Sequence, residues 1–553
     1  MSRDFKIIKA LKITISHVRN YLNISIEPPE IWSIKRVRAA LRGYRILRSK
    51  GQNTFLKNIG EQLTETKVGS GDVLFNSSIM PFSNEIADIS YRQYLLLNLV
   101  GTRLSASVLA HLSDGKPLTA PLPTDWIKVL QKNDLNIDLF NSRLIFFLFA
   151  IKQFCIAMVY FFAYLVSNIL SLIKCQEKNN GDFVYFIKLQ SDCLPPKDGS
   201  FQFNIVEWYL NWQDKSKKIK EIRHDLRGSD YMHKDFLIRY SPLLPRINGI
   251  SGFLHFVFWG IRSLIISFYY LIIGRLQYAI FLREMQKAKI FELADRSSIA
   301  KEYLHNNLDM DYRPLWTYAA EKQGSKIILY NWSAGFQDFL GPQGYPPTVV
   351  GEKIQNWPVV LQWSLPFAQY LKSVVSPKTE VKVVSPIYYC DTTPESYRKL
   401  GKPVIVLFDV TPQKNYFHDI LTPYVEYRTY PIGKKFLEDI YEAALDNGFD
   451  ILWKRKRNFN SNHNRGYINF SNKFINRPGV IDVNPRISAF RLVQEANGVI
   501  SMPFTSTAIV ADYFKKPSIY YDPTGFLHKE DRGAQGIPLI LGKEELNNWI
   551  RSL

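Results

Sequence analysis

Apolar and polar positions follow their most regular pattern in the C-terminal part of the chain. Short apolar runs predict strands at 404–409, 450–453 and 480–483, with helices at 433–447 and 486–496 between them. Strands that alternate with helices in this way are typical of a parallel, doubly wound sheet. The sequence therefore predicts a Rossmann-like domain here.

Residues 498–522 predict one complete strand–turn–helix–strand unit of that domain. After the strand, Pro503-Phe504 turns the chain, and a helix runs from three consecutive hydroxyl residues to the break at Lys516-Pro517. The N–H groups and the positive dipole end of a helix favour anions, and hydroxyl groups add donors. The pattern predicts a phosphate site, whereas the alternative is that Thr505 or Ser506 only caps the helix. The predicted phosphate-binding residues are Pro503, Thr505, Ser506 and Thr507.

A weaker pattern of the same kind occurs earlier in the chain. Residues 182–189 predict a strand that is followed by an aromatic helix at 205–212. A helix at 313–324 ends in glycine and precedes a strand at 325–332, while residues 285–303 have the spacing of a charged amphipathic helix. We expect a second α/β domain in this half.

Two long apolar segments flank the strand at 182–189. Residues 144–173 carry one charge, Lys152, and residues 251–273 are interrupted only by His255 and Arg262. Each is long enough to cross a bilayer, which needs about 20 residues. Membrane spans, in-plane or re-entrant anchors and core helices are the alternatives. Two spans would separate the intervening strand from the other soluble segments, and all flanks are basic, so we predict monotopic attachment on one face.

The first 60 residues are strongly basic. The spacing of apolar positions from Ile34 to Leu47 predicts a helix with an apolar stripe and a basic face. Two interpretations stay open, a solvated helix of the first domain or a helix that lies on an anionic membrane surface.

Composition narrows the classes of partner and compartment. The chain has 553 residues, 46% of them hydrophobic, and a formal net charge of +20. This excludes a disordered protein and favours an anionic partner. Four scattered cysteines argue against a disulfide framework or a zinc site and indicate a reducing compartment. The chain has neither a P-loop motif nor a GxGxxG motif after a strand, which argues against an NTPase and a dinucleotide oxidoreductase. It also has no HExxH motif or carboxylate–histidine cluster, so we expect no cofactor and no metal.

Three predicted strands of the C-terminal sheet end in polar or charged residues. Because the carboxyl ends of parallel strands meet at one edge, we expect these residues to converge on one site. Asp409 either orients a reacting group or caps the turn at Thr411, and Asp522 either contacts a ribose or forms an Asx turn. The run Lys454-Arg455-Lys456-Arg457 is either a solvated loop or a site for a departing phosphate.

These motifs resemble the bacterial polysaccharide-biosynthesis proteins that are named for their PFTS motif. The resemblance rests on residues 500–508, 516–523, 408–412, 452–457 and 313–316. The strand, hydroxyl turn, helix and Lys-Pro pattern is also similar to the donor-binding domain of GT-B enzymes, including CMP-sugar-dependent transferases and teichoic acid glycerophosphotransferases. The resemblance implies an α/β fold of GT-B type, with two Rossmann-like domains facing across a cleft, to which the two apolar segments of the N-terminal half are added. It carries over no catalytic base.

The sequence thus predicts a metal-independent GT-B glycosyltransferase that builds a surface polysaccharide of capsule or O-antigen type. Its expected partners are a nucleotide-sugar donor, a polysaccharide or lipid-linked acceptor and the cytoplasmic face of the plasma membrane. Lys454, Lys456 and Arg457 are expected to balance the leaving group, with Asp409, Thr411 and Asp522 at the donor. Glu207 is the candidate base, and a residue on a helix surface is the alternative.

Two other functions stay open. One is a glycerophosphotransferase that uses a CDP-activated donor, and the other is a non-catalytic protein that binds a membrane or nucleic acid by charge. The expected divisions are a basic helical region at 1–140, an acceptor-side α/β domain at 141–340, a linker with an inter-domain helix at 341–400, and a nucleotide-sugar-binding domain at 401–553.

Overall fold

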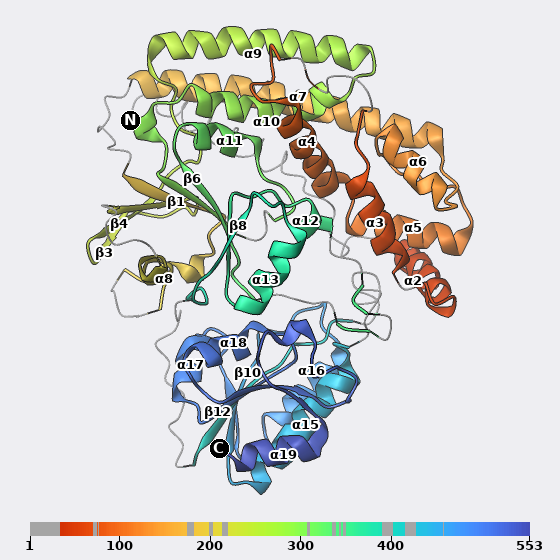
Figure 1. Ribbon diagram of the computed structural model, residues 1–553, viewed down its shortest axis with the longest axis vertical. Helices are drawn as coiled ribbons and strands as arrows, with labels where there is room; N and C mark the ends of the chain where they lie inside the picture. Colours follow the sequence, from red (N-terminus) through yellow and green to blue (C-terminus); the bar gives the residue numbers. More distant parts are fainter. Residues whose placement is uncertain are drawn as a thin grey trace, which may run out of the picture. The chain divides into compact units, whose positions relative to one another are not determined.

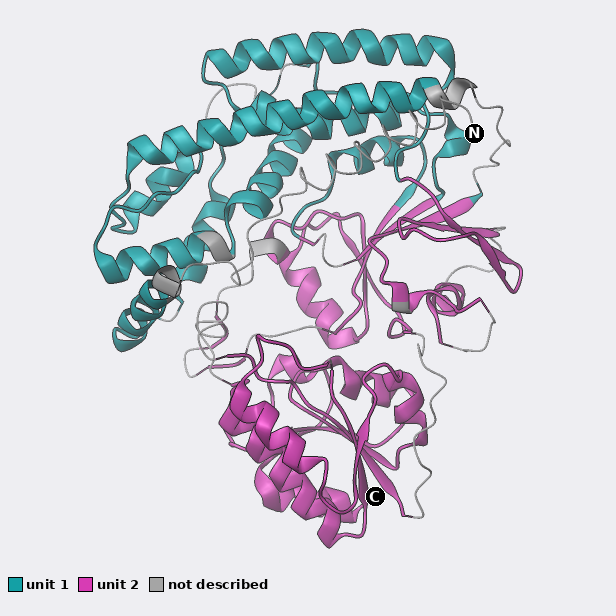
Figure 2. Ribbon diagram, turned by 180° about the vertical axis from the view of Figure 1, so that it is seen from behind, with its two compact units in different colours: residues 1–182, 243–301, 311–326 teal, residues 183–242, 302–310, 327–553 magenta. Residues whose placement is uncertain are grey.

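The computed structural model groups the chain into two compact units, shown in Figure 2. Unit 1 comprises residues 1–182, 243–301 and 311–326, and unit 2 comprises 183–242, 302–310 and 327–553. Residues 1–33 of the basic N-terminal region lie outside the described residues. The structure describes residues 34–52, 54–69, 75, 77–173, 182–197, 203–212, 219–306, 310–334, 339–341, 344–346, 350–389, 402–414, 427–456 and 458–553.

Unit 2 holds two sheets, and the first has eight strands in the order β3-β4-β2-β1-β5-β6-β7-β8 (Figure 1). Pairing is parallel from β4 through β2 and β1 to β5 and from β6 to β8, whereas β3 runs antiparallel at one edge. The strands are β1 Phe183–Ile187, β2 Glu221–His224, β3 Tyr231–His233, β4 Phe236–Tyr240, β5 Glu302–Asn306, β6 Lys326–Tyr330, β7 Val359–Gln362 and β8 Glu380–Val383. Helices α8 Ile205–Trp212, α12 Val350–Lys353 and α13 Leu365–Val374 also belong to this part.

The second sheet is parallel throughout, in the order β11-β10-β9-β12-β13-β14. Its strands are β9 Val404–Phe408, β10 Asp450–Lys454, β11 Val480–Val483, β12 Gly498–Ser501, β13 Ser518–Asp522 and β14 Leu539–Leu541. Its helices are α15 Tyr430–Asp446, α16 Arg465–Phe474, α17 Ala489–Glu495, α18 Ser506–Tyr513 and α19 Gly542–Arg551. The predicted α/β class with two parallel sheets is confirmed.

The register of the second sheet brings several strand ends to one level. Lys454 at the end of β10 and Ser501 at the end of β12 both lie opposite Phe408 at the end of β9. Ser501 in turn lies opposite Tyr520 of β13. Residues that follow these strands therefore emerge along one edge of the sheet, as the sequence predicts for its candidate site.

Unit 1 contains α2 to α7, α9, α10 and α11, and its two long apolar helices confirm the apolar segments predicted from the sequence. The orange α7 and the light green α9 run alongside one another in Figure 1. Where they meet, a Cβ atom on Gly260 would lie 2.1 Å from the ring of Phe161, so glycine permits this close approach. The helices are α2 Ile34–Ser49, α3 Phe55–Glu65, α4 Asn84–Leu99, α5 Thr102–Asp114, α6 Thr124–Lys132, α7 Leu139–Ile173, α9 Gly249–Ile272, α10 Gln277–Glu292 and α11 Leu315–Lys322.

The basic amphipathic helix predicted near residue 40 is α2, and its apolar face is covered by protein. Ala40, Tyr44 and Leu47 are buried, and α2 packs closely against α5. A Cβ atom on Gly43 would lie 1.8 Å from the carbonyl oxygen of Leu109, which fixes glycine at the contact. This arrangement favours the solvated-helix interpretation over the membrane-surface helix.

Two predictions of secondary structure differ from the structure. The helix predicted over 285–303 ends at Glu292, because Asp295 accepts a hydrogen bond from the backbone N–H of Ser297 and starts a short turn of 3₁₀ helix. Tyr303 then lies buried within β5. The segment 341–400, interpreted as a linker, contains β7, α13 and β8, and every residue of the short apolar run that forms β7 is buried in the first sheet.

Candidate anion-binding site

The turn after β12 is held by one aromatic side chain. Phe504 is buried and has a φ of +60°, a backbone conformation that costs free energy for a bulky residue. Its ring lies 5.2 Å from that of Phe339 and 5.7 Å from that of Tyr520, measured between centroids. A Cβ atom on Gly533 would lie 2.8 Å from the same ring. Packing on all these sides fixes the turn in place.

The three hydroxyl residues at 505–507 are half-buried, although the residues on either side of them are buried. Thr507 Oγ1 and Ser501 Oγ are 2.8 Å apart, and the Thr505 hydroxyl donates to the carbonyl oxygen of Met502 at 2.8 Å. Thr505 stands at the N-cap of α18 but its side chain makes no capping hydrogen bond. The first N–H groups of the helix are therefore not satisfied by the side chain that the capping alternative requires.

Ser506 has a different contact, with the loop that follows β6 of the first sheet. Its hydroxyl oxygen accepts a hydrogen bond from the backbone N–H of Ala334 at 2.9 Å. Gln535 reaches the same loop, because its amide nitrogen donates to the carbonyl oxygen of Ala334 at 2.9 Å, and it also accepts from the Ser364 hydroxyl at 2.6 Å. The hydroxyl turn is thus tied to loops of both sheets of unit 2.

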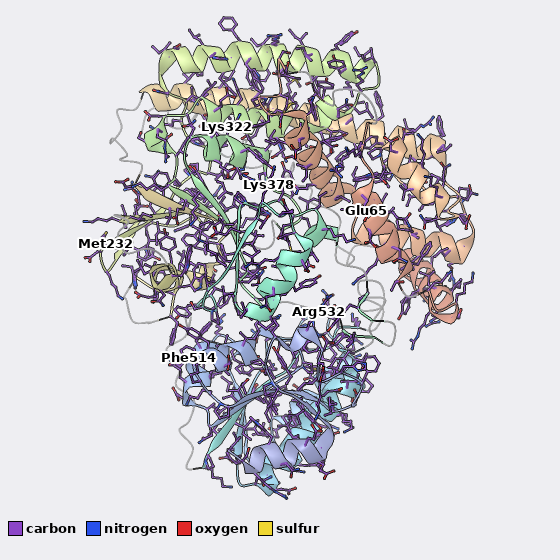
Figure 3. All side chains as sticks on the ribbon, viewed as in Figure 1. Glu65, Met232, Lys322, Lys378, Phe514 and Arg532 are labelled. Carbon is purple, nitrogen blue, oxygen red and sulfur yellow. The ribbon has the colours of Figure 1, made fainter. Side chains whose placement is uncertain are left out.

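The loop that contains Asp531 and Arg532, which the sequence did not indicate, also contacts segments that follow β6 and β7. Asp531 is buried and accepts hydrogen bonds from the N–H of Leu340 and the hydroxyl of Tyr345, at 2.7 and 3.1 Å. Arg532, labelled in Figure 3, lies 3.7 Å from the ring centroid of Tyr345 and 4.2 Å from that of Tyr370. The only local signal in the sequence is an Asp-Arg-Gly turn, which is too common to indicate such a role.

Asp409 follows β9 and is buried. The hydroxyl of Tyr467 donates a hydrogen bond to its carboxylate. Burial raises the pKa of Asp409 to about 6, and this rise is opposed by the hydrogen bond from Tyr467, by the nearby Trp453 indole and by the charge of Arg455. Thr411, two residues further on, is partly exposed. Asp409 therefore sits at the predicted edge of the sheet, held by side chains of its own domain.

The basic run after β10 is less free than its sequence suggests. The Lys454 ammonium is buried and donates to the carbonyl oxygen of Pro485 at 3.1 Å. Arg455 makes two hydrogen bonds with Asp482, at 2.6 and 3.1 Å. Lys456 is exposed, and Arg457 lies outside the described residues. At least one of the four cations is neutralised within the protein.

Arg428 is a cation near the hydroxyl turn that the sequence analysis did not single out. It is half-buried, and in the described part of the chain its Nε atom is buried without a hydrogen-bond partner. Burial lowers the pKa of Arg428, and the hydroxyls of Tyr427 and Tyr520 oppose this shift. Tyr520 also donates to the carbonyl oxygen of Thr505 at 2.8 Å, so one tyrosine contacts the turn and lies within electrostatic range of Arg428. No motif marks it, because its proximity depends on the folded sheet.

Asp522 holds the loop that follows β13. One carboxylate oxygen accepts hydrogen bonds from the Tyr427 hydroxyl and from the N–H and hydroxyl of Thr524, at 2.8, 2.8 and 2.6 Å. The other oxygen accepts from the N–H of Leu527 at 2.9 Å. The Asx turn that was one of the two interpretations is present.

Glu207 lies in the first turn of α8 and pairs with residues at the edge of the first sheet. Its carboxylate is 2.5 Å from the Lys234 ammonium and 3.5 Å from His233 Nε2. These contacts come from a different sheet than those of Asp409 and Lys454. Among the described residues, no group of three or more His, Cys, Asp or Glu side chains is arranged to hold a metal ion.

Comparison with known proteins places this geometry in a family. The profile of the polysaccharide biosynthesis PFTS motif proteins matches residues 259–550, more than half of the chain. That span includes β9 to β14, the hydroxyl turn and Arg428. A search of curated proteins finds no match.

Solved structures show only a distant likeness. The wall teichoic acid polymerase TagF is 11% identical, with 71% of this chain and 88% of that chain covered and a TM-score of 0.32. SnogD, a glycosyltransferase from Streptomyces nogalater, is 11% identical over 67% and 94% with a TM-score of 0.31. MurG from Acinetobacter baumannii is 8% identical over 67% and 90% with a TM-score of 0.27.

Proposed function

Because the chain belongs to the family of polysaccharide biosynthesis PFTS motif proteins, we propose that it is a glycosyltransferase that moves a sugar from a nucleotide-sugar donor to a surface polysaccharide or its lipid-linked precursor. In this reaction the bond between the anomeric carbon and the donor phosphate breaks, and an acceptor oxygen forms the new bond. The acceptor proton passes to a base, and the nucleotide leaves with the bonding electrons. The site must therefore stabilise a phosphate that gains negative charge.

The observation that carries the proposal is the hydroxyl turn, together with Arg428, which is linked to it through Tyr520. The half-buried residues 505–507 stand at a helix N-terminus without a side-chain cap. Arg428 is a half-buried cation whose Nε has no hydrogen-bond partner in the described part of the chain, which is costly unless an anion joins it. A donor phosphate supplies that anion, and the helix N–H groups and the hydroxyls supply further donors.

The other predicted site residues have different roles in this proposal: some approach the nucleotide, some support the strands, and one is the candidate base. Lys456 follows β10 at the same edge of the sheet and is exposed, so it can approach the leaving nucleotide. The role of Arg457 stays as predicted from the sequence, since this residue lies outside the described ones. Lys454 and Asp409 support the strand ends from within the domain. Glu207 stays the candidate base, and its pairs with Lys234 and His233 are the contacts that a base there would have to exchange for the acceptor hydroxyl.

We further propose that the protein acts at the cytoplasmic face of a membrane. By length and composition, two described helices, Leu139–Ile169 and Gly249–Ile272, are long and apolar enough to cross a bilayer. However, α10 packs against both helices and carries the buried residue Glu284, whose carboxylate pairs with Lys287 at 2.6 Å. A charged helix beside both apolar helices suits an in-plane position better than a span through hydrocarbon.

A titration with nucleotides tests the donor site. Thermal unfolding of the purified protein is measured with CMP, CDP, UDP, GDP and their sugar conjugates, and with CDP-glycerol. We expect one nucleotide class to raise the melting temperature, and Arg428→Gln to weaken its binding about 10- to 100-fold, because a charge-assisted hydrogen bond contributes about 1.5–3 kcal/mol. Ser506→Ala should weaken binding less, since its hydroxyl also serves the Ala334 N–H.

The matched control is Arg551→Gln. Arg551 is an exposed arginine of α19, whose neighbours Trp549 and Leu553 approach Gly498 at the start of β12, the edge opposite the hydroxyl turn. It removes the same charge from the same domain, so nucleotide binding should stay at the wild-type level. Equal weakening by both variants, or no stabilisation by any nucleotide, would reject the donor assignment.

A further inference from the structure

Unit 1 contains an open cavity of about 440 Å³ at one side of the apolar helix α9. It lies between the segment 77–81, α9 and α10, and is separate from the hydroxyl turn in unit 2. The volume is in the range of small-ligand sites. The polar and charged residues that line it are Ser77, Ser78, His255, Arg262, Lys289 and Glu292.

The charged side chains that line this cavity have a net positive charge. The Lys289 ammonium is buried and pairs with the Glu292 carboxylate at 2.8 Å. Arg262 is exposed and contributes a second positive charge on α9. With His255 neutral, the lining carries one net positive charge, and the two serine hydroxyls add donors. This chemistry suits a phosphate group, since Arg and Lys beside hydroxyls supply charge-assisted hydrogen bonds.

The apolar part of the lining continues onto an exposed face. Phe258 and Trp259 line the cavity, and Phe258 is 70% exposed. Further exposed apolar residues follow along α9 at intervals of three or four, so they form one stripe beside Arg262. They are Ile250, Leu254, Phe258, Ile261, Ile265, Phe268 and Ile272. A cationic cavity at the border of an apolar stripe matches a molecule that has a charged head and an apolar tail.

We propose that this cavity binds the phosphate of an anionic lipid while the lipid chains meet the apolar stripe of α9. The proposal rests on the membrane attachment given under the proposed function and specifies where one lipid head group is held. Arg262 is the principal contact because it is exposed at the border of cavity and stripe, whereas Lys289 is partly occupied by Glu292. The interaction would orient α9 along the surface, with the face that carries Phe256, Trp259 and Leu271 towards the protein.

Vesicle binding tests the proposal. The full chain is mixed with vesicles of phosphatidylcholine alone or with phosphatidylglycerol, and the bound fraction is measured by flotation. We expect tighter binding to the anionic vesicles, and a loss of about tenfold or more for Arg262→Gln. The control is Arg275→Gln, an exposed arginine just beyond the end of α9 that does not line the cavity. It removes the same charge, so its loss should not exceed the fivefold expected of one surface cation.

Three results would overturn the proposal. Equal losses for the two variants would mean general attraction to the surface, with no role for the cavity. Wild-type binding by Arg262→Gln would exclude its contact with lipid. If inorganic pyrophosphate raised the melting temperature through Arg262 while vesicle binding did not change, the cavity would belong to a soluble phosphate. Nucleotide stabilisation of Arg262→Gln, measured in parallel, reports separately on the donor site.

Discussion

The loop that follows β10 and the turn that follows β12 lie at the same edge of the second sheet but differ in how nearby positive charge is paired. The run that follows β10 has four consecutive cations, yet Arg455 is bound by Asp482 and Lys454 by a backbone carbonyl oxygen. The turn that follows β12 has no cation of its own, but Tyr520, which contacts it, lies within electrostatic range of Arg428, whose buried Nε lacks a partner among the described residues. A run of charges in the sequence is therefore a poorer guide to an anion site than one buried cation with an unsatisfied donor.

The same comparison separates rigid from adjustable parts of the site. The hydroxyl turn is fixed by Phe504, which packs among Phe339, Tyr520 and Gly533. The end of the basic run is exposed at Lys456. A preformed turn can hold a phosphate in one position, and an exposed lysine can follow the leaving group.

The largest effect is expected from removal of the anchor of the turn. Phe504→Ala should lower the free energy of unfolding by about 3–5 kcal/mol, because it deletes a buried aromatic ring and leaves a cavity. Nucleotide binding should fall with it, since the hydroxyls lose their fixed positions. Chemical denaturation and nucleotide titration measure both quantities. Phe526→Ala removes an exposed phenylalanine of the same domain and should change stability by less than about 0.5 kcal/mol. Normal nucleotide binding by a folded Phe504→Ala protein would contradict the anchoring role.

A smaller effect, with a defined pH dependence, is expected at Asp409. Burial raises its folded-state pKa to about 6 from the ordinary value of 3.8, so the folded state holds the proton more tightly than the unfolded state. The tighter proton binding by Asp409 in the folded state therefore adds to the free energy of unfolding. This contribution is complete below about pH 4 and is lost as the pH rises through 6. Asp409→Asn should therefore raise the free energy of unfolding at pH 7 by up to about 3 kcal/mol.

Denaturation at several pH values between 4 and 7 measures this contribution. The difference between wild type and Asp409→Asn should grow with pH across that range and then level off. Tyr467→Phe removes the hydroxyl that donates to the Asp409 carboxylate, so it should raise the pKa of Asp409 further. The free energy of unfolding of this variant should therefore fall more between pH 4 and pH 7 than that of the wild type. A difference that does not vary with pH would show that the carboxyl group does not titrate in this range.

The sequence predicted the parts of the fold that depend on local pattern. Short apolar runs located β9, β10, β11 and β12, and the two long apolar segments are α7 and α9. The prediction that the helix over residues 285–303 reaches Tyr303 was wrong. The helix ends at Glu292 and a short 3₁₀ helix capped by Asp295 follows, whereas the pattern of charges in the sequence continues past both. β8 was missed because its residues alternate between charged and apolar at the edge of the sheet, and β7 was missed although its apolar run is as short as those of β11 and β12.

The candidate site was predictable only in part, for a related reason. The hydroxyl turn is continuous in sequence, so its strand, turn and helix could be recognised together. Gln535 meets Ser506 only through the backbone of Ala334, and Arg428 is linked to the turn only through Tyr520, so pairing between strands and loops decides which residues meet there. The neutralisation of Arg455 by Asp482 also depends on the pairing of β10 with β11. The predicted roles of Thr505, Ser506, Thr507 and Lys456 stay predictions.

The smallest effect provides the sharpest check of the opening comparison. If Arg455 serves structure, a double-mutant cycle of Arg455→Gln and Asp482→Asn should give a coupling free energy of about 1 kcal/mol, as expected for a partly exposed two-bond ion pair. Nucleotide affinity should stay within about twofold of wild type in all three variants. A tenfold loss of nucleotide affinity with Arg455→Gln, together with no coupling to Asp482, would instead place the leaving nucleotide at the basic run. The Nε of Arg428, which has no partner among the described residues, would then have to be satisfied by something other than the donor.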